Sequence, residues 1–256
     1  GNLSWRIDTG GKDEIATVAL AFNRMSEQLR TVIQSAVEAE KMAALGRFAT
    51  SLAHEVRNPL STIKTTVQAL LATEPAGERR TLLISMDGEI NRLDDTLHDL
   101  LMYARPRPPQ FIRLEIWDML ERIRAMSNNL MRENHISLVI LGEADVAVIA
   151  DAGHVQQIMM NLILNAMQAM PDGGLLTIRA RREDHMGVIE LTDTGTGMSP
   201  EILRHVTEPF FTTRHDGTGL GLSVSKQLIE LNGGKLDFFS EPGQGTTVSL
   251  YLPLAE

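Results

Sequence analysis

The chain of 256 residues contains no cysteine, and aromatic residues make up only 4% of it. The lack of cysteine excludes disulfides, thiolate zinc sites and cysteine nucleophiles, and it suits a cytoplasmic protein. No hydrophobic run approaches the length needed to cross a bilayer, and the N-terminus has no signal-peptide pattern. The net charge of −9, without a basic stripe interleaved with aromatic residues, argues against general nucleic-acid binding.

Aliphatic residues are abundant, since hydrophobic residues make up 43% of the chain and 13 residues are methionine. Flexible aliphatic side chains of this kind fill interfaces between helices. A chain of this length accommodates two domains with separate cores. It opens abruptly beside a ready-made helix, so we expect a cytoplasmic fragment of a longer protein.

The N-terminal part predicts long amphipathic helices. Hydrophobic residues recur at steps of three and four from Ile15 to Val32 and again from Met42 to Leu70. In the alanine-rich stretch between them the phase slips by about one residue, which indicates either tolerance of small residues or two competing helical packings. A breaker-rich connection at 73–77 precedes a second helix of the same spacing, from Leu83 to Ala104.

Two long helices joined by a short loop must be antiparallel neighbours. Each helix carries a narrow hydrophobic stripe with too little bulk to close a core alone. We therefore predict that two hairpins associate as a four-helix bundle, which makes the protein a homodimer. The alternative, one hairpin packed on the C-terminal half, is less favoured because the stripe runs the full length of the hairpin.

The stretch around His54 places polar groups on the outer side of the first helix. If the neighbouring hydrophobic residues lie in the seam, His54 faces away from it, with Glu55 and Asn58 at helical spacing. Pro59 removes one backbone donor inside the pattern and should bend the helix. The alternative is an ordinary histidine on a solvated face, and this stretch alone does not decide between the two.

Beyond the stiff, proline-rich linker 105–109, the pattern changes to alternating strands and helices. We predict strands at 111–116, 136–141, 147–150, 175–182, 188–193, 235–240 and 246–252, and helices at 117–134, 151–170 and 220–232. Glycine-rich loops fill much of 194–218. This order of elements predicts an α/β sandwich, a mixed sheet with helices on one face.

Three stretches of this half suit a nucleotide. Asn161 and Asn165 lie one helical turn apart and offer oxygen ligands for a magnesium ion bound to a polyphosphate. Asp193, at the end of a strand, can accept a hydrogen bond from an exocyclic amine such as that of adenine. The glycines of 217–222 free backbone N–H groups for phosphate at the start of a helix, although the pattern is neither a Walker loop nor a Rossmann site. Taken singly, each stretch also fits a solvated helix face or an ordinary turn.

The order of these motifs is more specific than any one of them. Along the chain stand His-Glu-X-X-Asn-Pro-Leu at 54–60, Asn-X-X-X-Asn-Ala at 161–166, Asp-X-Gly-X-Gly at 193–197, Glu-Pro-Phe-Phe at 208–211 and Gly-Thr-Gly-Leu-Gly-Leu at 217–222. From Ala39 onward the chain closely resembles the sensor histidine kinases of two-component systems, with features of the nitrogen-regulation branch. Residues 1–30 resemble the second half of a HAMP signalling module.

The resemblance implies a multi-domain chain. Its expected parts are the C-terminal part of a HAMP-like coiled coil at 1–30, a dimerisation and histidine-phosphotransfer hairpin at 31–105, and an ATP-binding catalytic domain of the gyrase, Hsp90 and MutL type at 106–256. The hairpin would form a dimeric four-helix bundle, and the catalytic domain an α/β sandwich. The resemblance also implies an inner-membrane-anchored parent protein, with no membrane segment in this part of it.

The activity implied is ATP-dependent autophosphorylation of His54, followed by transfer to an aspartate of a separate response-regulator receiver domain. Glu55 would orient the imidazole, and Asn58 would position water for a phosphatase activity on that regulator. Two readings from other classes are an ATPase of the same fold, for which His54 is irrelevant, and a dimeric scaffold that binds nucleotide without chemistry.

ATP and Mg²⁺ are the implied cofactors. By motif, Asn165 is the expected metal ligand, Asn161 a phosphate contact, and Asp193 the adenine contact with Thr246 in support. Arg214 stands where lysine is frequent in relatives. The other expected nucleotide-binding residues are Gly195, Gly197, Thr213, Gly217, Thr218, Gly219, Leu220, Gly221 and Leu222.

Overall fold

The computed structural model describes residues 7, 14–143, 145–214 and 217–255. Within the first helix it leaves out the side chains at 14–16, 34–35, 38–39, 41–43, 45, 47–48 and 54. The side chain of His54 therefore lies outside the described residues. The chain divides into two compact units, residues 1–90 and 91–256.

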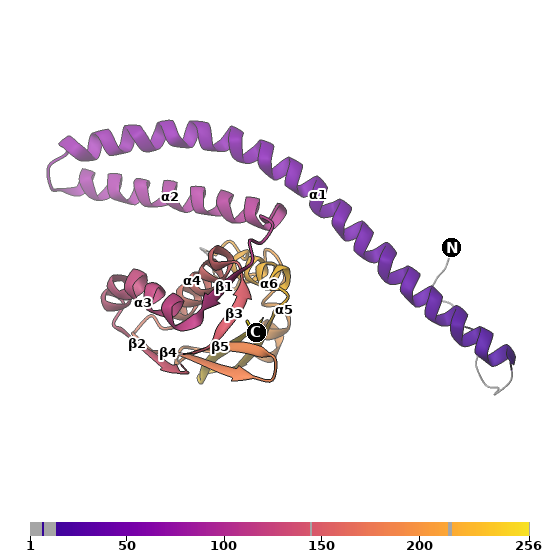
Figure 1. Cartoon of the computed structure of the whole chain (residues 1–256). Coiled ribbons are helices and arrows are strands. Elements are labelled where there is room, and N and C mark those ends of the chain that lie inside the picture. Colours follow the sequence, from indigo (N-terminus) through magenta and orange to yellow (C-terminus); the bar gives the residue numbers. More distant parts are fainter. Residues whose placement is uncertain (1–6, 8–13, 144, 215–216, 256) are drawn as a thin grey trace. The chain divides into compact units, whose positions relative to one another are not determined.

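The first unit contains most of a helical hairpin (Figure 1). Helix α1 spans Glu14–Thr73 and continues through Pro59, and helix α2 spans Glu78–Ala104. Between them, Arg80 Nη1 donates to the backbone oxygens of Leu71, at 2.7 Å, and Glu74, at 2.9 Å. These bonds satisfy carbonyls that the end of α1 leaves without an intrahelical partner, and so they fix the turn.

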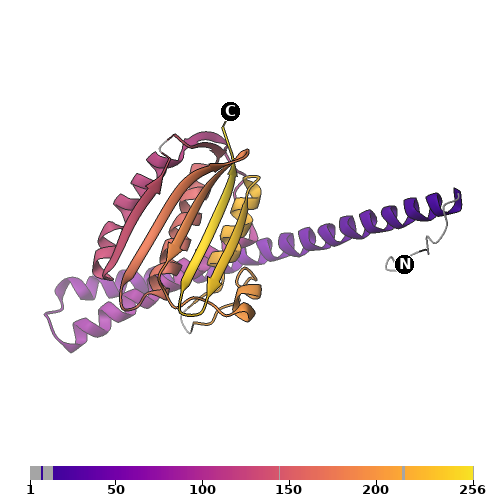
Figure 2. The same ribbon diagram turned by 90° about the horizontal axis from the view of Figure 1, so that it is seen from below.

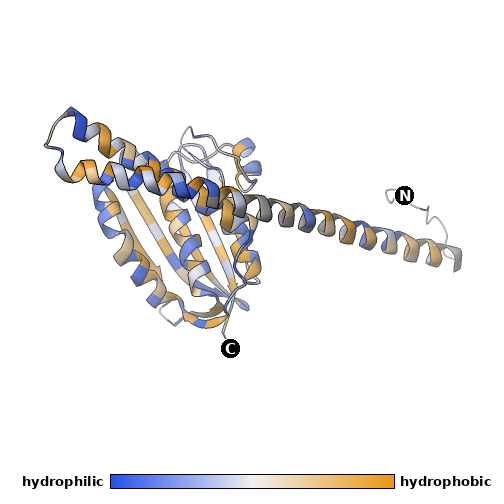
Figure 3. Cartoon of the chain, turned by 90° about the horizontal axis from the view of Figure 1, so that it is seen from above, coloured by the Kyte–Doolittle hydropathy of each residue, from blue (hydrophilic) through white to orange (hydrophobic). Residues whose placement is uncertain are grey.

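The hairpin buries only part of its hydrophobic stripe. Leu60, Val67 and Ile90 form a buried cluster, with Leu71 and Leu83 packed against it. Other members of the same stripe are about half exposed, namely Ile63, Leu70, Met86 and Leu93. Figure 3 shows hydrophobic segments recurring along both helices. An apolar face of this length remains without a covering partner within the described chain.

Near the start of α1, Asn23 holds the chain at Ile7 through a pair of hydrogen bonds. The Ile7 N–H donates to Asn23 Oδ1 at 3.0 Å, and Asn23 Nδ2 donates to the Ile7 carbonyl at 2.9 Å. The expected HAMP-like part lies partly outside the described residues. Among the described helices, none combines the length and hydrophobicity needed to cross a membrane.

The second unit contains a five-stranded sheet (Figure 2). Its strands lie in the order β2 (Ile136–Gly142), β4 (Gly174–Glu183), β5 (Met186–Asp193), β7 (Gly245–Pro253) and β6 (Lys235–Glu241). β2 runs parallel to β4, and every other neighbouring pair is antiparallel. One face is covered by α3 (Ile116–Glu133), α4 (Ala152–Ala169) and α6 (Gly221–Leu231). The hairpin followed by a mixed α/β sandwich confirms the predicted fold class.

Strand alternation decides where the functional side chains point. In β5, Ile189, Leu191 and Asp193 are buried beneath the helices, whereas Glu190 and Thr192 between them are only partly buried. Because successive side chains of a strand point to opposite faces, Asp193 extends the hydrophobic row on the helix-covered face. The core thus ends in a carboxylate at the end of β5.

A two-stranded antiparallel sheet of β1 (Ile112–Glu115) and β3 (Ala147–Ala150) adjoins the main sheet. The Ala255 N–H donates to the Ala147 carbonyl at 2.9 Å, which attaches this small sheet to the segment that follows β7. Four-residue strands are too short to be stable alone, so this attachment gives the small sheet its place.

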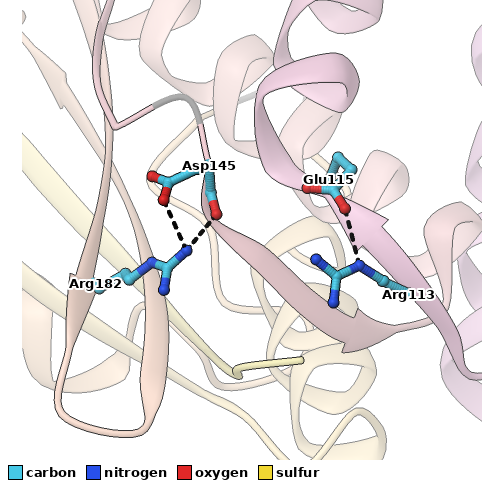
Figure 4. A network of polar contacts seen from close by, with 4 residues as sticks. All are labelled: Arg113, Glu115, Asp145 and Arg182. Atoms are coloured by element: carbon cyan, nitrogen blue, oxygen red, sulfur yellow. Dashed lines mark hydrogen bonds and ion pairs between the residues drawn. The ribbon is translucent and has the colours of Figure 1, made fainter. Parts of the chain in front are cut away.

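Arginine side chains also brace this region (Figure 4). Arg182 Nη2 of β4 donates to the Asp145 backbone oxygen and, at 3.1 Å, to the Asp145 carboxylate. Arg113 Nε lies 3.0 Å from Glu115 Oε1 within β1. Both ion pairs are exposed, so they add little to stability. The Arg182 pair also holds the loop between β2 and β3, in which Asp145 lies.

One helix lies where the sequence predicted only glycine-rich loops. Helix α5 spans Pro200–His205, and Ser199 Oγ accepts a hydrogen bond from the Ile202 N–H at 3.4 Å. Serine at the N-cap followed by proline at the first helical position is a recognised start signal for a helix. The element was missed because it is too short to show a hydrophobic period.

Candidate functional site

A cavity of about 410 Å³ opens at the end of the second unit where β5, β6 and β7 meet α4, α5 and α6. Most of the nucleotide-binding residues expected from the sequence line it. These are Asn161, Asn165, Asp193, Gly197, Thr213, Arg214, Gly217, Thr218, Gly219, Gly221, Leu222 and Thr246. The structure thus brings together motifs that lie up to 85 residues apart (246 − 161) in the sequence.

Two expected residues, Gly195 and Leu220, support the cavity from behind its lining. The Gly195 N–H donates to Asp193 Oδ1 at 2.8 Å and so orients that carboxylate. Leu220 is buried at the N-cap of α6, with its hydrophobic side chain in the core. Both residues therefore shape the cavity indirectly, through the residues next to them.

One end of the cavity is apolar. It is lined by Met198, Ile202, Val206, Phe211, Phe238 and Val248, none of which the sequence analysis singled out. Two of the six, Ile202 and Val206, come from α5 and its C-cap. A cavity with an apolar end and a few convergent polar groups suits a flat heterocycle.

The Asp193 carboxylate is the polar group at this end, and its side chain is only 7% exposed. Asp193 Oδ1 accepts hydrogen bonds from the backbone N–H groups of Gly195, at 2.8 Å, and Thr246, at 3.2 Å. Burial raises the pKa of Asp193, and these two donors oppose the rise. Its Oδ2 has no hydrogen-bond partner among the described residues, so it remains available as an acceptor.

The start of α6 is suited to an anion. Asp151 caps α4 by accepting from the His154 N–H at 2.9 Å, and Ser199 caps α5, but in the described chain no side chain caps α6. The N–H groups of its first turn are therefore left for a ligand, and the helix dipole favours a negative one. Gly221 and Leu222, in that first turn, line the cavity.

Asn161 links this helix start to α4. Its Nδ2 donates to the Gly221 carbonyl at 3.2 Å and to Ser225 Oγ at 3.4 Å. Ser225 Oγ in turn donates to the Gly221 carbonyl at 2.8 Å. The amide nitrogen of Asn161 is thus occupied by α6, and its carboxamide oxygen is left for the cavity.

Arg214 brings a positive charge to the side of the cavity formed by the end of α4. Its guanidinium donates to the Gln168 side chain and, at 3.3 Å, to the Asn165 backbone oxygen. Partial burial lowers the pKa of Arg214, yet a guanidinium remains charged at any ordinary pH. Gln168 had no motif around it and was not predicted.

The glycine at 219 is required by the backbone. Gly219 has φ of +67°, and a Cβ there would lie 2.5 Å from the carbonyl carbon of Phe210. The Phe210 N–H donates to the Gly219 carbonyl at 3.0 Å. Only glycine allows the Gly-rich motif to approach the Glu-Pro-Phe-Phe motif this closely.

The last turns of α2, from residue 91 on, belong to the second unit. Asp99 lines the cavity, and Tyr103, one turn later, contacts the Phe210 ring. Burial raises the pKa of Asp99, while neighbouring His98 lowers it and Asp95 raises it further. No sequence pattern linked this helix end to the nucleotide motifs, so Asp99 was missed.

Glu55 and Asn58 lie on α1, in the first unit, and both are exposed. Glu55 Oε1 accepts a hydrogen bond from Ser51 Oγ at 3.4 Å. These residues and His54 belong to a different unit from the cavity, and their roles remain predictions.

Two family models match the chain, in the order that the motifs suggested. The His Kinase A (phospho-acceptor) domain matches residues 44–109. The histidine kinase-, DNA gyrase B- and HSP90-like ATPase matches residues 150–256. The second match contains most of the cavity, and the first contains His54.

Curated relatives agree with these matches. Sensor histidine kinase ZraS of Klebsiella oxytoca is 32% identical over 91% of this chain and 51% of its own length. Sporulation kinase D of Bacillus subtilis is 33% identical over 85% of this chain and 44% of its own, and sensor protein DegM of a Bacillus species is 32% identical over 94% and 63%. The chain thus spans about half the length of the curated relatives it matches.

Solved structures show the same fold. Full-length ShkA, crystallised in complex with AMPPNP, has a TM-score of 0.71 and 24% identity over 81% of this chain and 45% of its own. Histidine kinase ThkA, in complex with response regulator protein TrrA, has a TM-score of 0.65 and 21% identity over 89% of this chain and 67% of its own. With both domain matches in this order, the chain belongs to the family of sensor histidine kinases.

Proposed function

We propose that this chain is the catalytic part of a protein-histidine kinase that transfers the γ-phosphoryl group of ATP to His54. One observation carries the proposal. A phospho-acceptor domain at 44–109 precedes an ATPase domain whose cavity combines the Asp193 acceptor with the uncapped start of α6. This combination suits a purine at one end and a polyphosphate at the other.

In this proposal the chain's own residues act mainly by positioning. Asp193 Oδ2 accepts from the adenine amine, and the first turn of α6 holds phosphate oxygens. A ring nitrogen of His54 attacks the γ-phosphorus while the bond from that phosphorus to the ADP oxygen breaks. Glu55 accepts the N–H of the other ring nitrogen, which makes the attacking nitrogen a better nucleophile.

The donor set fits a magnesium ion that arrives with the nucleotide. Asn165 lines the cavity and offers a hard, uncharged oxygen, which suits a cation whose charge is already balanced by phosphate. When bound, Mg²⁺ would neutralise charge that develops on the transferred phosphoryl group. Asn161 Oδ1, left unused by α6, is the second carboxamide oxygen at this end.

We propose a second copy of the chain and a response regulator as partners. The half-exposed stripe of Ile63, Leu70, Met86 and Leu93 suits a matching hairpin, as in a dimeric four-helix bundle. The phospho-acceptor match, and the likeness to ThkA in its complex with a response regulator, support a receiver aspartate as the final acceptor. The proposed domain ranges are 1–30, 31–105 and 106–256.

A phosphatase activity on that regulator is a second proposal. Asn58 is exposed one turn beyond His54, where a carboxamide can orient a water molecule toward a docked phosphoaspartate. Asn58→Ala should slow dephosphorylation of the phosphorylated receiver and leave labelling of His54 by ATP intact. Unchanged dephosphorylation would count strongly against this role.

The kinase proposal is tested by incubation of the full chain with γ-³²P-ATP and Mg²⁺. We expect an acid-labile, base-stable label that is lost in His54→Gln. His98→Gln is the matched control, because His98 is an exposed histidine on the other helix of the hairpin, and it should keep the label. Release of phosphate without protein labelling would indicate an ATPase, and binding without either would indicate a scaffold.

A further inference from the structure

The apolar end of the cavity is here called the base end, because the purine is proposed to lie there. Behind it lies a network of hydroxyl groups that no motif predicted. Its centre is Ser240 on β6, which is 8% exposed. Ser240 Oγ donates to the Gly245 carbonyl at 2.9 Å and accepts from the Met198 N–H at 2.9 Å. It also lies 2.9 Å from Thr246 Oγ1, a contact in which either oxygen is able to donate.

Counting protons decides which oxygen donates. A serine hydroxyl has one proton and two lone pairs. Ser240 gives its proton to the buried Gly245 carbonyl and receives the Met198 N–H on one lone pair. The remaining position toward Thr246 is a lone pair, so Thr246 must be the donor. The reverse assignment would withdraw the Ser240 proton from the Gly245 carbonyl, which costs more than it gains.

With its proton committed to Ser240, the Thr246 hydroxyl offers only lone pairs to the cavity that it lines. Asp193 Oδ2, also unpartnered among the described residues, is a second acceptor in that lining. The base end therefore presents two acceptors, held through the Thr246 N–H bond to Asp193 Oδ1. Such a pair favours an amino group and disfavours a carbonyl oxygen at the same place on a ring.

We propose that Ser240 is a positioning residue that fixes the Thr246 hydroxyl as an acceptor and so sets selectivity for a 6-aminopurine over a 6-oxopurine nucleotide. This inference rests on the proposed function, because it assumes that the cavity holds a purine nucleotide. Without Ser240, the Thr246 proton is free to turn toward the cavity and donate to a ring carbonyl. Selectivity should then fall even where overall affinity changes little.

The test measures binding of ADP and of inosine diphosphate, with Mg²⁺, to the full chain by calorimetry. These ligands differ at position 6 of the purine, an amine or a carbonyl, and at the adjacent N1, which carries a proton only in inosine diphosphate. We expect the wild type to prefer ADP, and Ser240→Ala to reduce the ratio of the two affinities by about fivefold. A purely structural loss would weaken both ligands equally, and partial misfolding would leave the ratio unchanged.

Two further variants show whether Ser240 acts through Thr246. In a Thr246→Val background, adding Ser240→Ala should leave the ratio unchanged, because the hydroxyl that Ser240 orients is gone. Ser240→Thr keeps a hydroxyl and should restore the preference. Ser249→Ala is the matched control, since it lies on β7 but on the opposite face of the sheet from Thr246, and its ratio should equal that of the wild type.

Equal affinity of the wild type for both ligands, or a Ser240→Ala ratio equal to that of the wild type, would overturn the inference and leave the kinase proposal standing. If the wild type prefers ADP and Ser240→Ala reduces that preference, but His54 is not labelled, the kinase proposal would be overturned and this inference supported. Failure of both nucleotides to bind would overturn both proposals.

Discussion

Tyr103 packs the edge of its ring against Phe210, with the ring centroids 6.5 Å apart and the planes inclined by 70°. Tyr103 is the next-to-last residue of α2, and Phe210 belongs to the Glu-Pro-Phe-Phe motif. Asp99 lies one turn before Tyr103 on the same helix face and lines the nucleotide cavity. One face of the helix end therefore brings both an aromatic contact and a carboxylate to this site.

Asp99→Asn should tighten nucleotide binding. A carboxylate beside a bound polyphosphate repels it, and removing a charge at a partly buried site is worth about 1 kcal/mol, or about fivefold in affinity. Calorimetry with ADP in the absence of Mg²⁺ measures the effect. Asp95→Asn is the control, because Asp95 lies one turn earlier and is exposed. Weaker binding by Asp99→Asn would instead give Asp99 an attractive role in the site.

Asp193→Asn should weaken ADP binding by about tenfold or more, because a hydrogen bond to a charged group is lost and an amide donor faces the adenine amine. In the wild type, binding needs the ionised carboxylate. Burial raises the pKa of Asp193 above its usual 3.8. As the pH is lowered, the affinity for ADP should therefore begin to fall while the pH is still above the ordinary carboxyl range. Titration of affinity against pH checks this, with Glu190→Gln on the open face of β5 as control.

Without nucleotide, the substitution that weakens ADP binding should not reduce the stability of the fold. A raised pKa in the folded state means that Asp193 contributes stability below pH 3.8, which is lost as the pH rises through the raised value. Asp193→Asn keeps an oxygen for the two backbone donors and removes the buried charge. Its melting temperature at neutral pH should therefore equal or exceed that of the wild type. A clear drop would show that the carboxylate stabilises the empty site.

The exposed hydrophobic stripe of the hairpin predicts which substitutions should prevent two hairpins from associating. Ile63 is 47% exposed, whereas Val67 on the same helix is 3% exposed. Ile63→Glu should place a charge in the interface between two hairpins and shift the chain from dimer to monomer in sedimentation. Thr65→Glu, exposed and off the stripe, should leave the dimer intact. If both variants sediment like the wild type, the apolar face serves another purpose.

Asp151 ties the linker to two helices. Its carboxylate accepts from the N–H groups of His154, at 2.9 Å, and Gln110, at 2.7 Å, and its own N–H donates to Asn232 Oδ1 at 2.7 Å. Asp151→Ala removes the cap of α4 and should lower the free energy of unfolding by about 1–2 kcal/mol. Asp172→Ala, at an exposed turn, should have little effect.

This loss should depend on pH. Burial would raise the pKa of Asp151, but the hydrogen bonds from Gln110, His154 and Gly153 and the charge of His154 together lower it below 3.8. A depressed pKa contributes stability above pH 3.8 that disappears as the pH falls through the lowered value. Urea unfolding at neutral and acidic pH should therefore show the difference between wild type and Asp151→Ala shrinking in acid. A constant difference would assign the whole effect to packing.

Much of the fold was predictable because the hydrophobic periods are long and regular. The strand ending at Asp193 and the helix carrying Asn161 and Asn165 lie where the sequence placed them. The motif order also indicated that these residues share one site. The hairpin, its short turn and the sandwich follow from the same spacing of hydrophobic residues, which can be read directly from the local sequence.

The rest depends on contacts that no local pattern records. Ser240 reads as an ordinary strand residue, and its role follows from how β6 and β7 pair. Asp99 lies about a hundred residues from the nucleotide motifs that it joins in the cavity. The spacing of hydrophobic residues on its helix indicates only that the helix belongs to the hairpin. Gln168 meets Arg214 only after α4 and the segment before α6 are folded together.

The two ends of the cavity belong to different kinds of structure. The acceptors Asp193 and Thr246 sit on paired strands, whereas the anion end is the first turn of α6, joined to α4 by the Asn161 carboxamide. A molecule that fills only the base end would occupy the site without engaging the helix. Filling the base end and engaging α6 are thus separable, and a competitor shaped like adenosine alone should block the cavity without contacting the first turn of α6.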